Sequence, residues 1–214
     1  MQNALITEGG LDDLYTQVLS RVPRDDNFDR VLGTVILVRS PLPINFLGHL
    51  LRIDTAKIVH TLLGIQSILL IPGNDDQAIQ LFHTSLRDFL MTPERSRGYF
   101  IEPLFRHLHI ASDCLLAIRE PPTDDIFFDE GQKYACVHWF YHLWQALAKG
   151  GQDYLNTLLS EMPLINCLQD FAFDFWFNTV LVEIPRKVIV IALSEVARTL
   201  EVSEMSRLFR DLEN

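Results

Sequence analysis

Apolar residues recur at helical spacing along the first part of the chain. Within three segments they stand three or four positions apart, which is typical of helices that bury one face. These segments cover residues 11–22, 28–36 and 43–51. A fourth helix is predicted over residues 54–63, with Asp54 as its N-cap and Gly64 at the C′ position that ends it. The chain is therefore predicted to begin with four short helices.

The pattern changes after Gly64. Residues 67–71 and 77–82 are predicted as two short strands, and residues 72–76 between them have the composition of a tight turn. The two helices that precede the strands are joined by Arg52-Ile53-Asp54, which predicts a helix-turn-helix. A helix-turn-helix followed by a β-hairpin is the element order of a winged helix.

Further helices are predicted in the second half of the chain. Two apolar stripes lie on either side of a loop near residues 120–132, which contains Pro121, Pro122 and several acidic residues. The first stripe is Leu104, Leu108, Ala111, Leu115 and Ile118, and the second is Tyr134, Val137, Tyr141, Trp144 and Leu147. Later helices are predicted at residues 153–161, 164–181, 187–200 and 203–212.

The predicted fold is mainly α, with one small β-hairpin. Residues 1–10 form an N-terminal tail, residues 11–93 a winged-helix domain, and residues 94–214 an α-helical domain with the acidic, proline-containing loop. The helical part shows no clean period of about 33 or 34 residues, so ankyrin and TPR repeats are not predicted.

Charge argues against DNA binding, which is a common role of winged helices. The chain has 18 Lys and Arg against 28 Asp and Glu, a formal charge of −10, and so acidic a surface repels phosphate backbones. The helix over residues 54–63 carries one cation, Lys57, and the hairpin turn carries Asp75 and Asp76. We therefore expect no nucleic-acid partner.

Cysteine usage and hydropathy indicate the compartment. Cys114, Cys136 and Cys167 are odd in number and far apart, which predicts no disulfide framework and a reducing environment. The first residues lack the pattern of a secretory leader, and the apolar runs at 65–71 and 188–193 are too short to span a bilayer. A cytoplasmic protein with no membrane span is expected.

His83 lies where the predicted return strand runs into a helix. Ser85 and Asp88 have the spacing of a capping box, which predicts a helix start at this point. An imidazole at such a junction can point into a cleft, or it can bond a nearby carbonyl in a structural role. His83, Ser85 and Asp88 are also the residue types of a hydrolase triad, but residues so close in sequence at a helix start are not expected to converge in relay geometry.

Two other clusters have competing interpretations. His138 and His142 are four residues apart on a predicted helix and could chelate zinc, yet a third ligand is not evident and helix packing is expected, so no metal site is predicted. The aromatic cluster Phe171, Phe173, Phe175, Trp176 and Phe177 fits a buried core better than an exposed binding surface, and both interpretations remain open.

Several segments resemble one protein family. They are residues 10–15 (GLDDLY), 30–35 (RVLGTV), 63–69 (LGIQSIL) and, above all, 82–90 (FHTSLRDFL). They are similar to the region that follows the nucleotide-binding core in fungal NACHT-type signal-transduction NTPases, which are NLR-like proteins of the STAND class. The resemblance covers most of residues 10–120 and is loose after about residue 165.

The resemblance implies a role for His83. In that class the winged helix folds over the nucleotide pocket, and a histidine at its last strand-to-helix junction contacts the β-phosphate of ADP and holds the off state. The following Asp-Phe-Leu aligns His83 with that histidine without a gap. Phe82 and Thr84 stand where plant relatives have Met and Asp.

The chain has no GxxxxGK[ST] phosphate loop and no Walker B strand. We therefore expect a non-catalytic, regulatory piece of such a switch that carries no cofactor by itself, while ADP or ATP binds the parent protein. Its expected partners are a NACHT core in cis or in trans and protein partners or a C-terminal repeat sensor. A helical protein–protein adaptor is the alternative, and a winged-helix DNA-binding protein is a weaker one.

Overall fold

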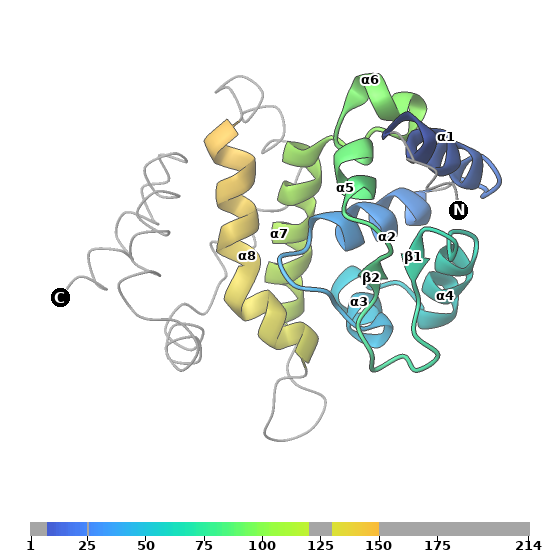
Figure 1. The fold of residues 1–214 in the computed structure, drawn as a ribbon. Coiled ribbons are helices and arrows are strands. Elements are labelled where there is room, and N and C mark those ends of the chain that lie inside the picture. Colours follow the sequence, from blue (N-terminus) through green and yellow to red (C-terminus); the bar gives the residue numbers. More distant parts are fainter. Residues whose placement is uncertain (1–7, 25, 120–129, 150–214) are drawn as a thin grey trace. The chain divides into compact units, whose positions relative to one another are not determined.

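A computed structural model describes residues 8–24, 26–119 and 130–149 (Figure 1). The chain divides between Pro103 and Leu104 into two compact units. Helices dominate the described part of both units, which confirms the mainly α prediction. The predicted domain boundary lies earlier, at residue 93, whereas the two short helical elements after it pack with the first unit.

The first unit contains the four predicted helices, a two-stranded sheet and three short helical elements. They are α1 (Glu8–Leu19), α2 (Asp26–Leu37), α3 (Ile44–Leu51), α4 (Thr55–Leu63), β1 (Leu69–Leu70), β2 (Gln80–Leu81), α5 (Ser85–Leu90), α6 (Pro93–Ser96) and the 3-10 helix η1 (Arg97–Tyr99). The second unit contains α7 (Pro103–Arg119) and α8 (Glu130–Lys149).

The core of the first unit forms where α2, α3 and α4 pack together. Val31, Leu51 and Ile58 come from these three helices, and each is fully buried. Burial of side chains of this size stabilises a fold by about 1.5–3 kcal/mol each. The apolar spacing in the sequence therefore predicts this core correctly.

The turn between α3 and α4 ends one helix and starts the next within three residues. Arg52 takes a left-handed conformation, with φ 52°, and its N–H bonds the carbonyls of the last turn of α3. Asp54 then accepts a hydrogen bond at 3.0 Å from the backbone N–H of Ala56, as an N-cap does. The predicted cap is confirmed.

Gly64 ends α4 in a different way from the one predicted. Its φ of −63° is right-handed, so it does not supply the left-handed C′ conformation. A Cβ at this position would lie 2.8 Å from Cγ2 of Val22, in the chain that follows α1. A glycine is needed here because α4 ends against Val22, and not because of its backbone angle.

The hairpin is shorter than predicted. β1 and β2 pair antiparallel with Leu69 opposite Leu81, and an isolated antiparallel bridge joins Pro43 to Ala78. The hairpin turn is also tied to the start of α3, because Asn45 Nδ2 donates to the Asp76 carboxylate at 2.7 Å. The segment before α3 is thus linked to the two-stranded sheet by one isolated bridge and one side-chain hydrogen bond.

In the second unit, the predicted face of α7 is confirmed in its middle, with Leu104 and Ile118 at its ends half-buried, and the predicted face of α8 is only partly right. Leu108, Ala111 and Leu115 are fully buried on α7. On α8 Tyr134 is buried as predicted, but Trp144 of the same stripe is 39% exposed. The most buried side chains of α8 are Ala135, Trp139, His142, Leu143 and Ala146. Aromatic and aliphatic residues surround much of this helix, so their spacing does not select a single face.

Several predictions fall outside the described residues. These are residues 120–129 of the acidic loop, the four helices predicted after residue 152, Cys167 and the aromatic cluster at 171–177. Residues 130–132 of the predicted loop are the first turn of α8.

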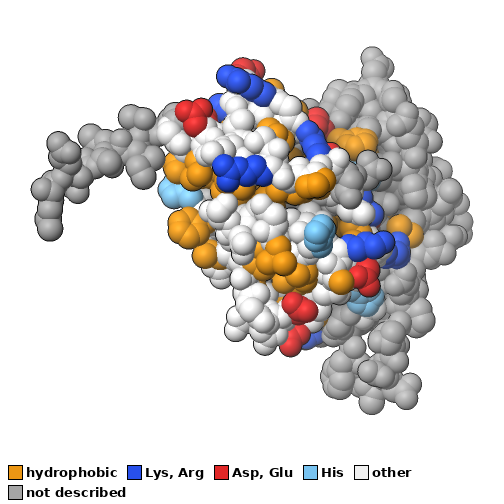
Figure 2. Space-filling view, turned by 90° about the vertical axis from the view of Figure 1, so that its right-hand side faces the viewer, with side chains coloured by type: hydrophobic (Ala, Val, Ile, Leu, Met, Phe, Trp, Pro, Cys, Tyr) orange, Lys and Arg blue, Asp and Glu red, His pale blue; other side chains and the backbone are white. Residues whose placement is uncertain are grey.

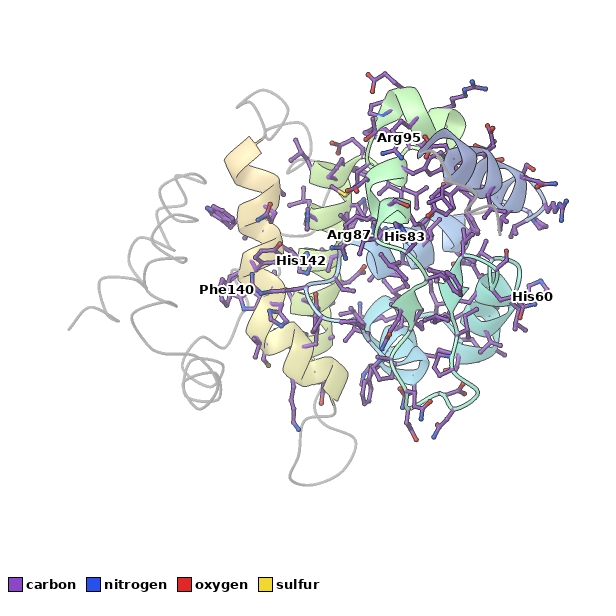
Figure 3. All side chains as sticks on the ribbon, viewed as in Figure 1. His60, His83, Arg87, Arg95, Phe140 and His142 are labelled. Carbon is purple, nitrogen blue, oxygen red and sulfur yellow. The ribbon has the colours of Figure 1, made fainter. Side chains whose placement is uncertain are left out.

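Helix α1 is fastened to α6 by an ion pair. Arg95 of α6 (Figure 3) donates from Nε and Nη2 to the two carboxylate oxygens of Asp12, at 2.9 and 2.7 Å. The bond from Arg95 lowers the pKa of Asp12 from its ordinary value of 3.8. Because the folded-state pKa is lowered, the pair stabilises the fold above that value, and this stability is lost as the pH falls through the lowered pKa.

Asp12→Asn should lower the free energy of unfolding at pH 7 by about 1 kcal/mol, because a two-point ion pair is lost. Urea unfolding over a series of pH values measures this loss, which should shrink as the pH falls below the ordinary Asp value. Asp13→Asn, an exposed neighbour, is the matched control. An equal loss in both variants at all pH values would contradict the assignment.

Gly64→Ala should lower the free energy of unfolding by about 1–3 kcal/mol, because the stiff Val22 side chain cannot move aside freely. The loss should be smaller when Val22 is also replaced by Ala. Gly73→Ala is the control, since a Cβ there meets nothing within 4 Å. Chemical unfolding of the single and double variants measures the coupling. No difference between the effects of Gly64→Ala in the two backgrounds would contradict the close approach.

Candidate functional site

His83 lies in the short connection between β2 and α5 and is exposed. Figure 3 shows it at the start of α5, away from His60 on α4. The strand-to-helix junction predicted from the sequence is therefore confirmed. Helix α5 is packed into the core of the first unit, because Leu86, Phe89 and Leu90 are fully buried.

The ring of His83 is bonded by Ser85 through two groups. The backbone N–H of Ser85 donates to His83 Nδ1 at 3.1 Å, and the Ser85 hydroxyl lies 2.7 Å from the same nitrogen. Tyr15 Oη of α1 lies 2.8 Å from Ser85 Oγ. Tyr15 of α1, Ser85 of α5 and His83 in the connection before α5 thus share one chain of hydrogen bonds.

The predicted capping box at Ser85 and Asp88 is wrong. Thr84 is the N-cap residue of α5, it makes no side-chain capping bond, and the Ser85 side chain faces His83 and Tyr15 instead. The imidazole of His83 accepts the free N–H of Ser85, which is the task that a Ser or Asp side chain performs at an ordinary helix start.

The hydrogen bonds assign the proton on the ring. A nitrogen that accepts a backbone N–H carries no proton, so neutral His83 holds its proton on Nε2. The orienting partners all act on Nδ1, and none of the bonds described for this ring uses Nε2. The junction therefore presents an exposed N–H donor.

Ser85 and His83 lie within hydrogen-bonding distance of each other, but with Asp88 they do not converge in the relay geometry of a triad, as expected. Within the described part of the chain, neither Asp88 nor any other carboxylate bonds the ring. Ser85 is half-buried, and its hydroxyl is shared with Tyr15. The three residues consequently do not form the base–nucleophile relay of a triad.

Arg87 adds a positive charge one helical turn beyond His83. It is exposed, and its guanidinium makes no hydrogen bond or ion pair with any residue that the structure describes. Figure 3 labels the two residues on either side of the lower end of α5. A histidine N–H and a guanidinium together are suited to a phosphate group.

Hydrophobic side chains are exposed beside this junction. Phe82, which directly precedes His83, is 67% exposed, and Leu70 of β1 is 47% exposed. Figure 2, a view from the right-hand side of Figure 1, shows several groups of hydrophobic side chains on this side of the molecule, together with Lys and Arg side chains. The first unit therefore exposes apolar as well as basic groups.

The second unit contains a buried polar network that the sequence did not reveal. His107 Nδ1 of α7 lies 2.8 Å from His142 Nδ1 of α8, and Tyr134 Oη lies 2.7 Å from His142 Nε2. All three side chains are buried. His142 therefore serves helix packing, as predicted. His138 lies differently: it is half-buried and packs against Tyr134, with ring centroids 4.6 Å apart.

Cys114 and Cys136, the two described cysteines, are buried and form no disulfide within the described residues. Burial raises the pKa of Cys114 well above its ordinary range and raises the pKa of Cys136 to about 12. Both thiols therefore stay protonated at neutral pH, which does not suit a nucleophile or a metal ligand.

The described residues contain neither a group of metal ligands nor a membrane-spanning helix. No three His, Cys, Asp or Glu side chains there come together in a group able to hold a metal ion. No helix within the same residues combines the length and apolar character that a bilayer crossing requires.

Comparisons with known proteins leave the family open. No protein-family profile, curated protein or solved structure matches this chain. The resemblance to NACHT-type NTPases consequently stays a prediction based on the quoted segments, and the geometry at His83 is the basis for a functional proposal.

His142→Phe should lower the free energy of unfolding by about 2–4 kcal/mol, because His107 and Tyr134 each lose a buried hydrogen-bond partner. Tyr134→Phe removes only one of these bonds and should cost less. Thermal and urea unfolding of both variants give the comparison. If His142→Phe were as stable as the unmodified chain, the network would not contribute to the packing of α7 and α8.

Proposed function

We propose that this chain is a non-catalytic regulatory part of a NACHT- or STAND-type signal-transduction NTPase. In this proposal residues 11–93 form a winged helix that closes over the ADP pocket of a NACHT core, joined in cis or bound in trans. His83 donates a hydrogen bond to a phosphate oxygen of ADP and holds the inactive state. The proposed setting is the cytoplasm, and the helical part relays opening of the switch to a C-terminal repeat sensor or another protein.

The element order of the first unit supports the winged-helix assignment. α2 is followed by the bridged residue Pro43, by α3 and α4 across a tight turn, and then by β1 and β2. The Pro43–Ala78 bridge adds a third segment to the hairpin. A helix-turn-helix with a small sheet of this kind is the arrangement expected of a winged helix.

The bond from the Ser85 N–H to His83 Nδ1 is the observation on which the proposed role of His83 depends. It assigns the proton to Nε2, so His83 can donate to a phosphate while remaining neutral. Arg87 supplies the positive charge that an ADP phosphate requires, and it is exposed on α5, four residues after His83.

The exposed apolar residues support a protein partner next to His83. Phe82 exposes 67% of its surface although it directly precedes the junction. Contact with a NACHT core would bury this ring, because the core must approach His83 closely to bring a phosphate to it. The same exposed ring also favours the second candidate function, a protein–protein adaptor that acts without a nucleotide.

DNA binding receives less support. Lys57 is the only cation of α4, and the turn of the hairpin is acidic. Asp76 also accepts a hydrogen bond from Asn45, so this turn is engaged with the start of α3. Neither element offers the positive charge that phosphate contacts need.

Replacing His83 should weaken ADP binding. The chain is joined behind a NACHT core from its own genome, and ADP is titrated by calorimetry. His83→Ala should cost about 1.5–3 kcal/mol, which is roughly a 10- to 150-fold loss of affinity, because a hydrogen bond to a charged phosphate is removed. His60→Ala, on the exposed surface of α4, is the matched control and should bind as the unmodified protein does.

Equal affinities of the His83→Ala variant and the unmodified fusion would contradict the sensor role. The adaptor function would then be favoured, and its signature is association with a protein partner that is unaffected by ADP. Affinity for duplex DNA that falls steeply with salt would instead favour the DNA-binding alternative.

A further inference from the structure

The hydrogen bonds at His83 extend into the core of the first unit. Tyr15 is buried on α1, its hydroxyl lies 2.8 Å from Ser85 Oγ, and Ser85 Oγ lies 2.7 Å from His83 Nδ1. The chain of bonds thus runs from a buried tyrosine through a half-buried serine to an exposed histidine. Local sequence patterns do not predict this chain of bonds, because Tyr15 and Ser85 are 70 positions apart.

The direction of the bonds follows from the backbone donor. Since Nδ1 accepts the Ser85 N–H, the Ser85 hydroxyl next to Nδ1 must also donate toward it. Ser85 Oγ is then free to accept, and the Tyr15 hydroxyl donates to it. The protons of both hydroxyl groups therefore point along the chain toward His83, and each bond strengthens the next.

We propose that Ser85 and Tyr15 are positioning residues that hold His83 in its Nε2–H form with a fixed ring orientation. This inference rests on the proposed function, in which the Nε2–H group meets a phosphate oxygen of ADP. Ser85 acts directly on Nδ1 and Tyr15 acts through Ser85. Neither residue contacts the nucleotide in this arrangement.

The packing of Tyr15 explains how a buried residue can orient the sensor. Its ring lies against that of Phe89, with the centroids 5.3 Å apart, and Phe89 is fully buried on α5. The same tyrosine thus fixes α5 through its ring and the ring of His83 through its hydroxyl. Tyr15→Phe keeps the ring contact and removes only the hydrogen bond.

The test begins with the free chain, without nucleotide or core. Histidine is labelled with ¹⁵N, and the ring nitrogens are observed by NMR at about pH 8.5, where an ordinary histidine is neutral. His83→Gln identifies the signals of His83 among the seven histidines by their loss. The ¹⁵N chemical shift separates a protonated ring nitrogen from an unprotonated one.

In the unmodified chain His83 should carry its proton on Nε2 alone. Ser85→Ala should raise the share of the Nδ1–H form, Tyr15→Phe should raise it less, and Ser85→Thr, which keeps a hydroxyl, should resemble the unmodified chain. A predominantly Nδ1–H form in the unmodified chain would overturn the proposal. Identical His83 signals in the unmodified chain and the three variants would also overturn the proposal.

ADP titrations of the fused protein separate this inference from the proposed function. Ser85→Ala should weaken ADP binding about 3- to 10-fold, less than His83→Ala, because the sensor is present but poorly oriented. If His83→Ala leaves ADP affinity unchanged while Ser85→Ala alters the tautomer, the proposed function is overturned and the positioning of the ring stands. If His83→Ala weakens binding but Ser85→Ala changes neither affinity nor tautomer, the positioning role is overturned alone.

Discussion

The contact between Tyr15 and Phe89 is the interaction on which the geometry at His83 depends. It joins α1 to α5, and the three apolar residues of α5 are fully buried around it. Burial of each of these side chains stabilises the fold by about 1.5–3 kcal/mol. The exposed His83 side chain has no comparable burial to hold it in place. The exposed ring of His83 keeps one orientation because α5, which follows it, is packed into the core and because Ser85 bonds Nδ1 of the ring.

The local signals in the sequence predicted the first unit well. Apolar spacing found α1 to α4, Asp54 marked the start of α4, and the junction at His83 was recognised. The capping box predicted at Ser85 is wrong. The backbone N–H of Ser85 is bonded by the ring of His83, and no Ser or Thr side chain caps this helix start. Gly64 also misled, since its role depends on Val22, which is distant in sequence.

Contacts between distant residues could not be predicted from spacing. His107 and His142 are 35 positions apart, and only the pairing of α7 with α8 brings their ring nitrogens together. The buried face of α8 was likewise misjudged, because Ala135 and Ala146 are buried while the larger Trp144 is exposed. At the candidate site, the junction was recognised from residue spacing and the sensor role was implied by the family resemblance, but the assignment of the His83 proton required the observed bond to the Ser85 N–H.

The most direct test of the sensor role is a structure of the chain joined behind its NACHT core with ADP bound. The proposed arrangement places His83 Nε2 at a hydrogen-bonding distance, about 2.7–3.2 Å, from a phosphate oxygen, with Nδ1 still bonded by Ser85. Phe82 should then be covered by the core. A closed, ADP-filled pocket with His83 facing solvent would contradict the account.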